Sequence, residues 1–241
     1  MSKIADNLTD VWRRIEAACL RARRDLSDIE LIAVSKTCPA AAVREASTAG
    51  QQHFGESRWQ EAEPKIDLLP GCLHWHFIGR IQRNKVRKIL PRFEVIHAVD
   101  STTLASSMNE MARELGLFPK VFLQVNVSGE ASKGGFAPAA LAADMDFLLA
   151  MERLEIMGLM CIPPVGRNAE AARPWFAALR NLRDNLACGS GVPLSCLSMG
   201  MSDDFEVAIE EGATHVRVGS AIFGKRTRQT DDGSANYISN S

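Results

Sequence analysis

The chain has 241 residues, of which 46% are hydrophobic and 24% are charged, a composition typical of a soluble globular protein with one large or two small domains. Its formal net charge of -1 gives no electrostatic reason to expect nucleic acid as a partner. No apolar stretch approaches the roughly 20 residues that a membrane-spanning helix needs, so we expect no membrane association.

The first predicted element is an amphipathic helix over 7–24, where apolar residues recur at helical spacing. Short apolar runs with the character of buried strands then recur along the chain, at 31–35, 53–55, 74–78, 95–98, 121–127, 156–161, 194–199 and 215–218. Helix-like stretches lie between most of them, at 40–49, 101–115, 138–153, 174–186 and 203–210.

About eight such repeats in this length predict an α/β protein with a single (β/α)8 TIM-type barrel, preceded by one extra helix. A doubly wound open sheet is the main alternative. Residues 1–226 contain no Pro/Gly/Ser-rich linker, so we predict one domain over 1–226. Residues 227–241 are polar and aperiodic, which predicts a disordered tail.

The cellular compartment is predicted from the N-terminus and the cysteines. The first residues lack the apolar segment of a secretory signal peptide, which favours a cytoplasmic protein. Six cysteines are scattered without a C-x-x-C pair, so we expect reduced thiols rather than a disulfide framework or a thiolate zinc site.

Lys36 comes directly after the first predicted strand. Loss of water at such a place lowers the pKa of a lysine, and a neutral amine can attack a carbonyl to form a Schiff base. The alternative is a lysine that ends an exposed strand, which composition alone favours because lysines are rarely buried. The other residues expected at the carboxyl ends of the strands favour the reactive lysine, because a barrel builds its active site there.

The segment 216–224 is typical of a last strand that runs through a Gly219-Ser220 turn into a short helix. Backbone amides at such a turn, with a hydroxyl beside them, bind anions, and phosphate often binds here in barrels. Ser202 offers a second hydroxyl, and we predict Asp203 as an N-cap. Arg217 is placed to face a ring nitrogen or a carboxylate inside the barrel; a structural ion pair with a neighbouring strand is the alternative.

His74 and His76 share one face of a predicted strand, a spacing that sometimes supports metal binding. The sequence shows no third ligand or carboxylate near them, so we predict no metal and expect His76 to face the pocket from a packed strand.

Several ordered blocks resemble the pyridoxal 5'-phosphate (PLP) homeostasis proteins, from the first helix to about residue 226. The matching blocks are AVSKT at 33–37, FGE at 54–56, WHFIG at 75–79 with Gln82 and Asn84-Lys85, QVN at 124–126, 130–133, GLM at 158–160, and SMGMS at 198–202 with Val216-Arg217. The resemblance implies a fold-type III barrel, similar to the N-terminal domain of alanine racemase, that holds PLP as an internal aldimine.

The resemblance also assigns roles to matching residues. Lys36 would form the Schiff base, Arg217 would face the pyridine nitrogen, and Ser202, Gly219 and Ser220 would hold the phosphate. This agrees with the geometry expected above for a barrel mouth.

Two further positions are expected near the cofactor, Ser57 and His76. The family usually has Asn where this chain has Ser57. Serine is shorter and offers one donor instead of two, so the contact made there is expected to be lost or to run through water.

The resemblance favours a carrier over an enzyme. Racemases of similar fold place a tyrosine from a second, β-rich domain opposite the lysine, whereas the only tyrosine here is Tyr237 in the polar tail. We therefore expect no robust catalysis, but intracellular storage or delivery of PLP to apo-enzymes, with indirect effects on amino-acid and keto-acid balance. A weak PLP-dependent racemase that pairs Lys36 with His76 or Cys161 is the enzyme alternative, and a cofactor-free interaction module is a third.

Lys133 lies in a loop that matches the family's Glu-x-x-Lys-x-Gly pattern and is a candidate second amine for cofactor transfer. A solvent-facing loop lysine is an equally good interpretation. Because the β-rich domain that builds the racemase dimer is not expected, we predict a monomer.

Overall fold

Eight parallel strands form a closed barrel in the computed structural model, which describes residues 2–130 and 133–224. Each strand pairs with the next along the chain, and β8 pairs with β1 to close the ring. The strands are β1 Glu30–Val34, β2 His53–Glu56, β3 His74–Phe77, β4 Val95–Val99, β5 Lys120–Gln124, β6 Glu155–Met160, β7 Cys196–Ser198 and β8 His215–Val218. The predicted (β/α)8 barrel is confirmed, and the open sheet is wrong.

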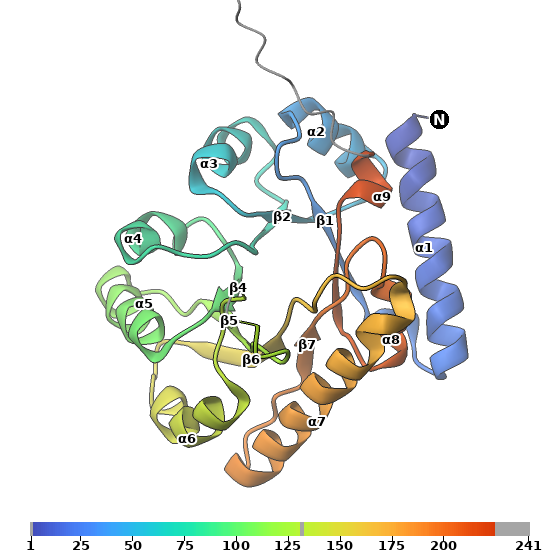
Figure 1. Cartoon of the computed structure of the whole chain (residues 1–241). Helices are drawn as coiled ribbons and strands as arrows, with labels where there is room; N and C mark the ends of the chain where they lie inside the picture. Colours follow the sequence, from blue (N-terminus) through green and yellow to red (C-terminus); the bar gives the residue numbers. More distant parts are fainter. Residues whose placement is uncertain (1, 131–132, 225–241) are drawn as a thin grey trace, which may run out of the picture.

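Helices surround the strands (Figure 1). They are α1 Lys3–Ala22, α2 Ala40–Thr48, α3 Trp59–Leu68, α4 Val86–Ile89, α5 Thr102–Leu115, α6 Pro138–Leu149, α7 Arg173–Ser190, α8 Phe205–Glu210 and α9 Ser220–Phe223. None of the helices in 2–130 and 133–224 is long and apolar enough to cross a membrane. The tail expected over 227–241 lies outside the described residues, so the domain end at 226 stays a prediction.

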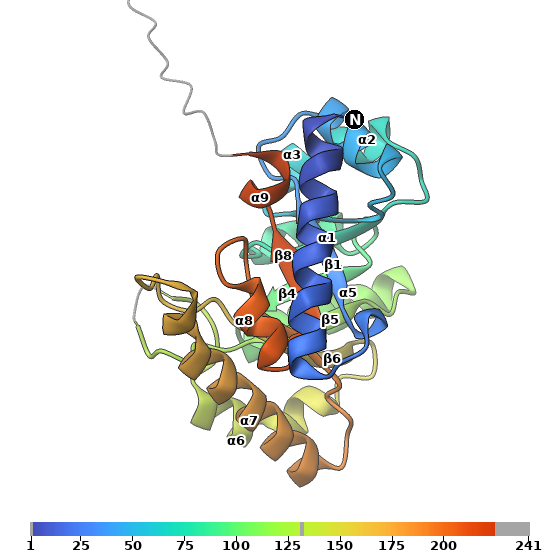
Figure 2. The same ribbon diagram turned by 90° about the vertical axis from the view of Figure 1, so that its right-hand side faces the viewer.

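Helix α1 is the predicted extra helix, and it begins earlier than expected because Ser2 caps it. The Ser2 hydroxyl accepts a hydrogen bond from the Ala5 amide at 3.3 Å. The helix packs against α2, α8 and α9, and Figure 2 shows it running past α9 and then α8. The Asn7 side-chain amide also donates to the Ile222 carbonyl of α9 at 2.8 Å. The chain's first helix is therefore joined to its last.

Two local expectations differ from the structure. Helix α3 was not predicted, because Pro64 lies inside it and removes one backbone donor. The predicted N-cap at Asp203 is wrong: Asp204 precedes α8, and its carboxylate accepts a hydrogen bond from the Met201 amide at 2.6 Å.

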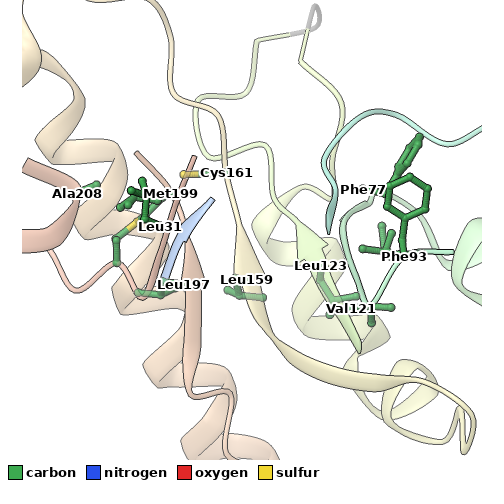
Figure 3. Close-up of a cluster of buried hydrophobic side chains, with 14 of the residues drawn as sticks. Leu31, Phe77, Phe93, Val121, Leu123, Leu159, Cys161, Leu197, Met199 and Ala208 are labelled. Atoms are coloured by element: carbon green, nitrogen blue, oxygen red, sulfur yellow. The ribbon is translucent and has the colours of Figure 1, made fainter. Parts of the chain in front are cut away.

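The main core lies between the strands and the helices. Residues on the outward face of the strands pack against the helical shell there, and Phe77 meets the Phe93 ring edge-on at 5.1 Å between centroids (Figure 3). A second, small apolar cluster of Val95, Ala98, Phe122 and Met160 faces the barrel lumen. Much of the remaining lumen is polar, which is unusual because branched apolar side chains dominate most barrels of this type.

A buried ion pair holds the strand end that precedes Lys36. Glu56 is fully buried, and its Oε1 accepts hydrogen bonds from Lys65 Nζ at 2.7 Å and from the Ser35 hydroxyl at 2.6 Å. Lys65 Nζ also donates to the Ser35 carbonyl at 2.8 Å. Burial raises the pKa of Glu56, although the hydrogen bonds that it accepts from Lys65 and Ser35 lower it. The pair therefore ties α3 to the ends of β1 and β2.

We predict that Lys65→Met lowers the free energy of unfolding by about 3–5 kcal/mol at about pH 8, because it leaves a buried charge unpaired. Below its unfolded-state pKa of about 4.3, Glu56 is protonated in both the folded and the unfolded protein, so its burial carries no charge penalty. Because its folded-state pKa is higher, the variant loses stability as the pH rises through that folded-state pKa. The deficit relative to wild type should therefore shrink at about pH 5, which urea unfolding at both pH values measures. The double variant Lys65→Met/Glu56→Leu should recover most of the lost free energy of unfolding, because it removes the unpaired charge. A deficit of Lys65→Met that is small or does not change with pH would contradict this account.

Candidate functional site

A cavity of about 900 Å³ opens at the mouth formed by the carboxyl ends of the strands. Six of the seven predicted cofactor residues line it: Lys36, Ser57, Ser202, Arg217, Gly219 and Ser220. They come from β1, β2, β7 and β8 or from the loops that follow these strands. Apolar residues complete the wall, among them Ile78 and Ile162. The structure therefore brings together most of the residues that the sequence singled out.

Lys36 is held by its neighbours on both sides. The preceding Ser35 amide continues the ladder with β2 by donating to the Gly55 carbonyl at 3.0 Å. The following Thr37 has φ of 66°, a left-handed conformation that is strained for a β-branched residue. Its amide donates to Glu61 Oε2 at 3.0 Å, which holds it there. Lys36 is half-buried between these fixed points.

The turn after β8 forms a cradle of backbone amides. The Gly219 and Ala221 amides donate to the Ser202 hydroxyl at 3.1 and 3.3 Å. The hydroxyl oxygen thus occupies the place at the start of α9 where an anionic oxygen would be bound. The cradle lines the same cavity as Lys36.

Arg217 is buried, and its guanidinium is held by residues that do not line the cavity. It donates to the Ser198 hydroxyl, and to the Cys161 carbonyl at 3.0 Å. Burial lowers its pKa, but a guanidinium stays protonated in proteins. In the described part of the chain it forms no ion pair with a carboxylate, so the alternative of a structural ion pair is not supported.

A glycine brings Ser57 close to the end of β3. A Cβ atom on Gly79 would lie 2.2 Å from the Ser57 carbonyl oxygen, which no side chain tolerates. Only glycine allows the loop after β2 to pack this closely, and that packing puts Ser57 at the cavity.

His76 is the predicted site residue that the structure does not bring to this cavity. Both of its ring nitrogens are engaged deeper in the lumen, with His53 Nδ1 at 3.1 Å and His97 Nε2 at 3.0 Å. The expectation that no carboxylate lies near it is wrong, because Glu30 Oε1 is 3.5 Å from His76 Nε2. The residues His53, His97 and Glu30 were missed because they come from other strands of the barrel.

Neither Lys133 nor Cys161 lies among the residues that line the cavity. Lys133 is in the loop after β5, where its amide donates to the Glu130 carbonyl at 3.0 Å. Cys161 is fully buried, and burial raises the pKa of its thiol to about 12. The pairings of Lys36 with His76 or Cys161 that a racemase would need are therefore not formed at this mouth.

The cavity is also lined by residues that the sequence analysis did not assign to it, notably Thr37 and Asp203. Asp203 was interpreted as a helix cap, and only the fold shows that it faces the cavity. The strain at Thr37 has no signature in sequence, because threonine rarely adopts this conformation.

Comparisons with known proteins agree with this architecture. Residues 10–227 match the family model described as alanine racemase, N-terminal domain. A Pseudomonas aeruginosa protein named pyridoxal phosphate homeostasis protein is 49% identical over 228 residues, which cover 94% of this chain and 97% of that one. A protein of the same name from Aquifex aeolicus is 43% identical over 222 residues, covering 92% and 97%.

Solved structures give the same result. PipY of Synechococcus elongatus, solved with PLP bound, is 42% identical and superposes with a TM-score of 0.80, covering 92% of this chain and all of that one. Alanine racemase from Corynebacterium glutamicum shares the fold, with a TM-score of 0.68 at 18% identity over 96% of this chain and 63% of the racemase. The chain therefore belongs to the alanine racemase N-terminal domain family and, within it, to the pyridoxal phosphate homeostasis proteins.

Proposed function

We propose that this protein binds PLP covalently through Lys36 and acts as an intracellular carrier that stores the cofactor and delivers it to apo-enzymes. One observation carries the proposal: a half-buried lysine, a buried guanidinium and an amide cradle line one cavity of about 900 Å³. PLP presents a complementary set of groups, namely an aldehyde, a ring nitrogen and a phosphate.

Each group of PLP has a counterpart in the cavity. The phosphate fits the cradle of Ser202 and the Gly219 and Ala221 amides, because a phosphate oxygen can accept the bonds that the serine hydroxyl now accepts. Lys36 supplies the amine for the aldehyde, and Arg217 is the donor for the pyridine nitrogen. Ser57 and Ser220 complete the set that we assign to the cofactor.

The guanidinium opposite the pyridine nitrogen would weaken the electron-withdrawing power of the bound cofactor without abolishing it. When bound, PLP can act as an electron sink, and it does so best with a protonated ring nitrogen. Arg217 is itself a permanent donor, so a ring nitrogen placed against it would accept a hydrogen bond and stay unprotonated. This weakens the electron sink while holding the ring in place.

A racemase would also need a second proton-transfer group opposite the lysine. His76 and Cys161, the two candidates from sequence, are engaged or buried away from the cavity. The relatives are named for cofactor homeostasis. We therefore favour the carrier over the weak racemase.

The remaining part of the proposal concerns the setting in which the protein works. All six cysteines are thiols, which suits a reducing compartment such as the cytoplasm. We propose that the carrier works there as a monomer, and that its partners are PLP and apo-enzymes that require it.

To test the Schiff base, the visible spectrum is recorded with added PLP, followed by borohydride reduction and peptide mapping. We expect wild type to give a Schiff-base absorption band and a label on Lys36, because this amine lies in the cavity. Lys36→Ala should lose both, whereas Lys133→Ala should keep both. A label that is absent or that lies elsewhere in wild type would overturn the proposal.

Ser202→Ala tests the phosphate cradle. We expect it to weaken PLP binding about tenfold, about 1.4 kcal/mol, because one hydrogen bond to a charged group is lost. Binding of pyridoxal, which lacks the phosphate, should not change. Titrations of both compounds measure the difference, and an equal loss for both would place the phosphate elsewhere.

Lys133→Ala tests transfer. If Lys133 is the second amine, this variant should load Lys36 normally but release PLP more slowly to an apo-enzyme, as followed by recovery of that enzyme's activity. The matched control is Lys120→Ala, which removes a lysine from the opposite end of β5. An unchanged transfer rate would show that Lys133 is an ordinary loop lysine.

A further inference from the structure

The end of the barrel opposite Lys36 contains a cluster of side chains that the proposed function does not use. Glu30 and His53 are the first residues of β1 and β2, and His76 lies in β3 beside them. Their ligating atoms all lie within 4.8 Å of one another. These residue types, two imidazoles and a carboxylate, are the ones that bind transition metals.

The distances within the cluster fit a tetrahedral ion. His53 Nδ1 is 3.1 Å from His76 Nε2, and the two Glu30 oxygens lie 3.5 Å from one of these nitrogens each. Zinc bonds imidazole nitrogen and carboxylate oxygen at about 2.0–2.2 Å, so tetrahedral ligand atoms are separated by about 3.3 Å. An ion could enter once the Glu30 carboxylate rotates to bring one oxygen near both nitrogens.

One oxygen of the Glu30 carboxylate lacks a hydrogen-bond donor. Glu30 Oε1 is buried and accepts no hydrogen bond within the described residues.

Neighbouring groups already orient two of the three side chains, those of His76 and Glu30. His76 Nδ1 shares a hydrogen bond with His97 Nε2, and His97 Nδ1 shares one with the Ser198 hydroxyl at 2.8 Å. This leaves His76 Nε2 directed at the cluster. His215 Nε2 lies 3.4 Å from Glu30 Oε1, and its Nδ1 is 2.8 Å from the Thr214 hydroxyl. Such outer contacts are a regular feature of metal sites.

The cluster is also accessible. A cavity of about 830 Å³ opens at this end of the barrel, and Glu30, His53 and His215 line it. The side chains of Glu30 and His53 are 30% and 29% exposed, while that of His76 is 1% exposed. An ion can therefore reach the site from solvent, and water can fill the remaining coordination position.

We propose that Glu30, His53 and His76 form a zinc site at the amino-terminal end of the barrel. Neutral imidazoles with one carboxylate suit Zn²⁺, whereas Mg²⁺ and Ca²⁺ prefer oxygen ligands. The ion supplies a partner for the buried Glu30 Oε1 atom and ties together β1, β2 and β3 at the end remote from the PLP cavity.

Untagged, chelator-treated protein is titrated with Zn²⁺ in competition with a chromophoric chelator. We expect wild type to bind one ion per chain, and Glu30→Gln/His53→Gln to bind at least about a hundredfold more weakly because two ligands are lost. His74→Gln is the matched control: His74 stacks on the His53 ring but pairs with Glu94, and its loss should leave the affinity unchanged. Lys36→Ala should bind zinc as wild type does, which separates this site from the PLP site.

Cobalt provides a second measurement on the wild-type protein, which is needed if the double variant fails to fold. We expect the visible absorption of four-coordinate Co²⁺ with nitrogen and oxygen ligands. Wild type that binds neither ion, a folded double variant with wild-type affinity, or a spectrum with thiolate charge-transfer bands would each overturn the proposal.

Discussion

Closure of the barrel between β1 and β8 is the constraint on which the rest of the molecule depends. The ladder sets Ala33 opposite Val218, so the residues that follow each strand leave the barrel at the same mouth. Lys36 and the turn at Gly219 are thus neighbours, although they come from opposite ends of the chain. Pairing β1 with β8 costs conformational entropy, because it closes a loop of nearly the whole chain. Burial of the apolar layer between strands and helices must offset this cost.

The sequence predicted the barrel because buried strands and amphipathic helices have local periodicities that are easy to recognise. It also predicted most of the candidate site, since strand ends converge and the resemblance identified the residues located there. It missed features that arise from contacts between distant segments. In the sequence, nothing distinguishes Lys65 from a solvent-facing lysine, and only the fold brings it to Glu56. In the same way, Glu30 has the sequence character of an exposed strand end, and only the barrel places it against His53 and His76. Asp203 was misplaced because two adjacent aspartates are equally good caps.

The polar lumen is what distinguishes this barrel from one filled with branched apolar side chains. All five histidines of the chain lie along its strands, and hydrogen bonds link Arg217 through Ser198, His97 and His76 to His53. Each buried polar group would cost about 1–3 kcal/mol if it were left without a partner. These side chains are therefore stable in the lumen only while all of them stay hydrogen-bonded to one another. The two ends of the barrel, with different chemistry at each mouth, are therefore joined by one continuous series of hydrogen bonds.

The contact between the first and last helices has a consequence for how firmly the turn at Gly219 is held. Helix α9 is only one turn long and could not persist by itself. The Asn7 amide binds its Ile222 carbonyl, so α1 acts as an external brace for the amides that open α9. Loss of this contact would free the turn to fray while the barrel ladders stay intact, because the contact lies outside the barrel. The helix that precedes the barrel thus supports one side of the candidate site as well as being part of the scaffold.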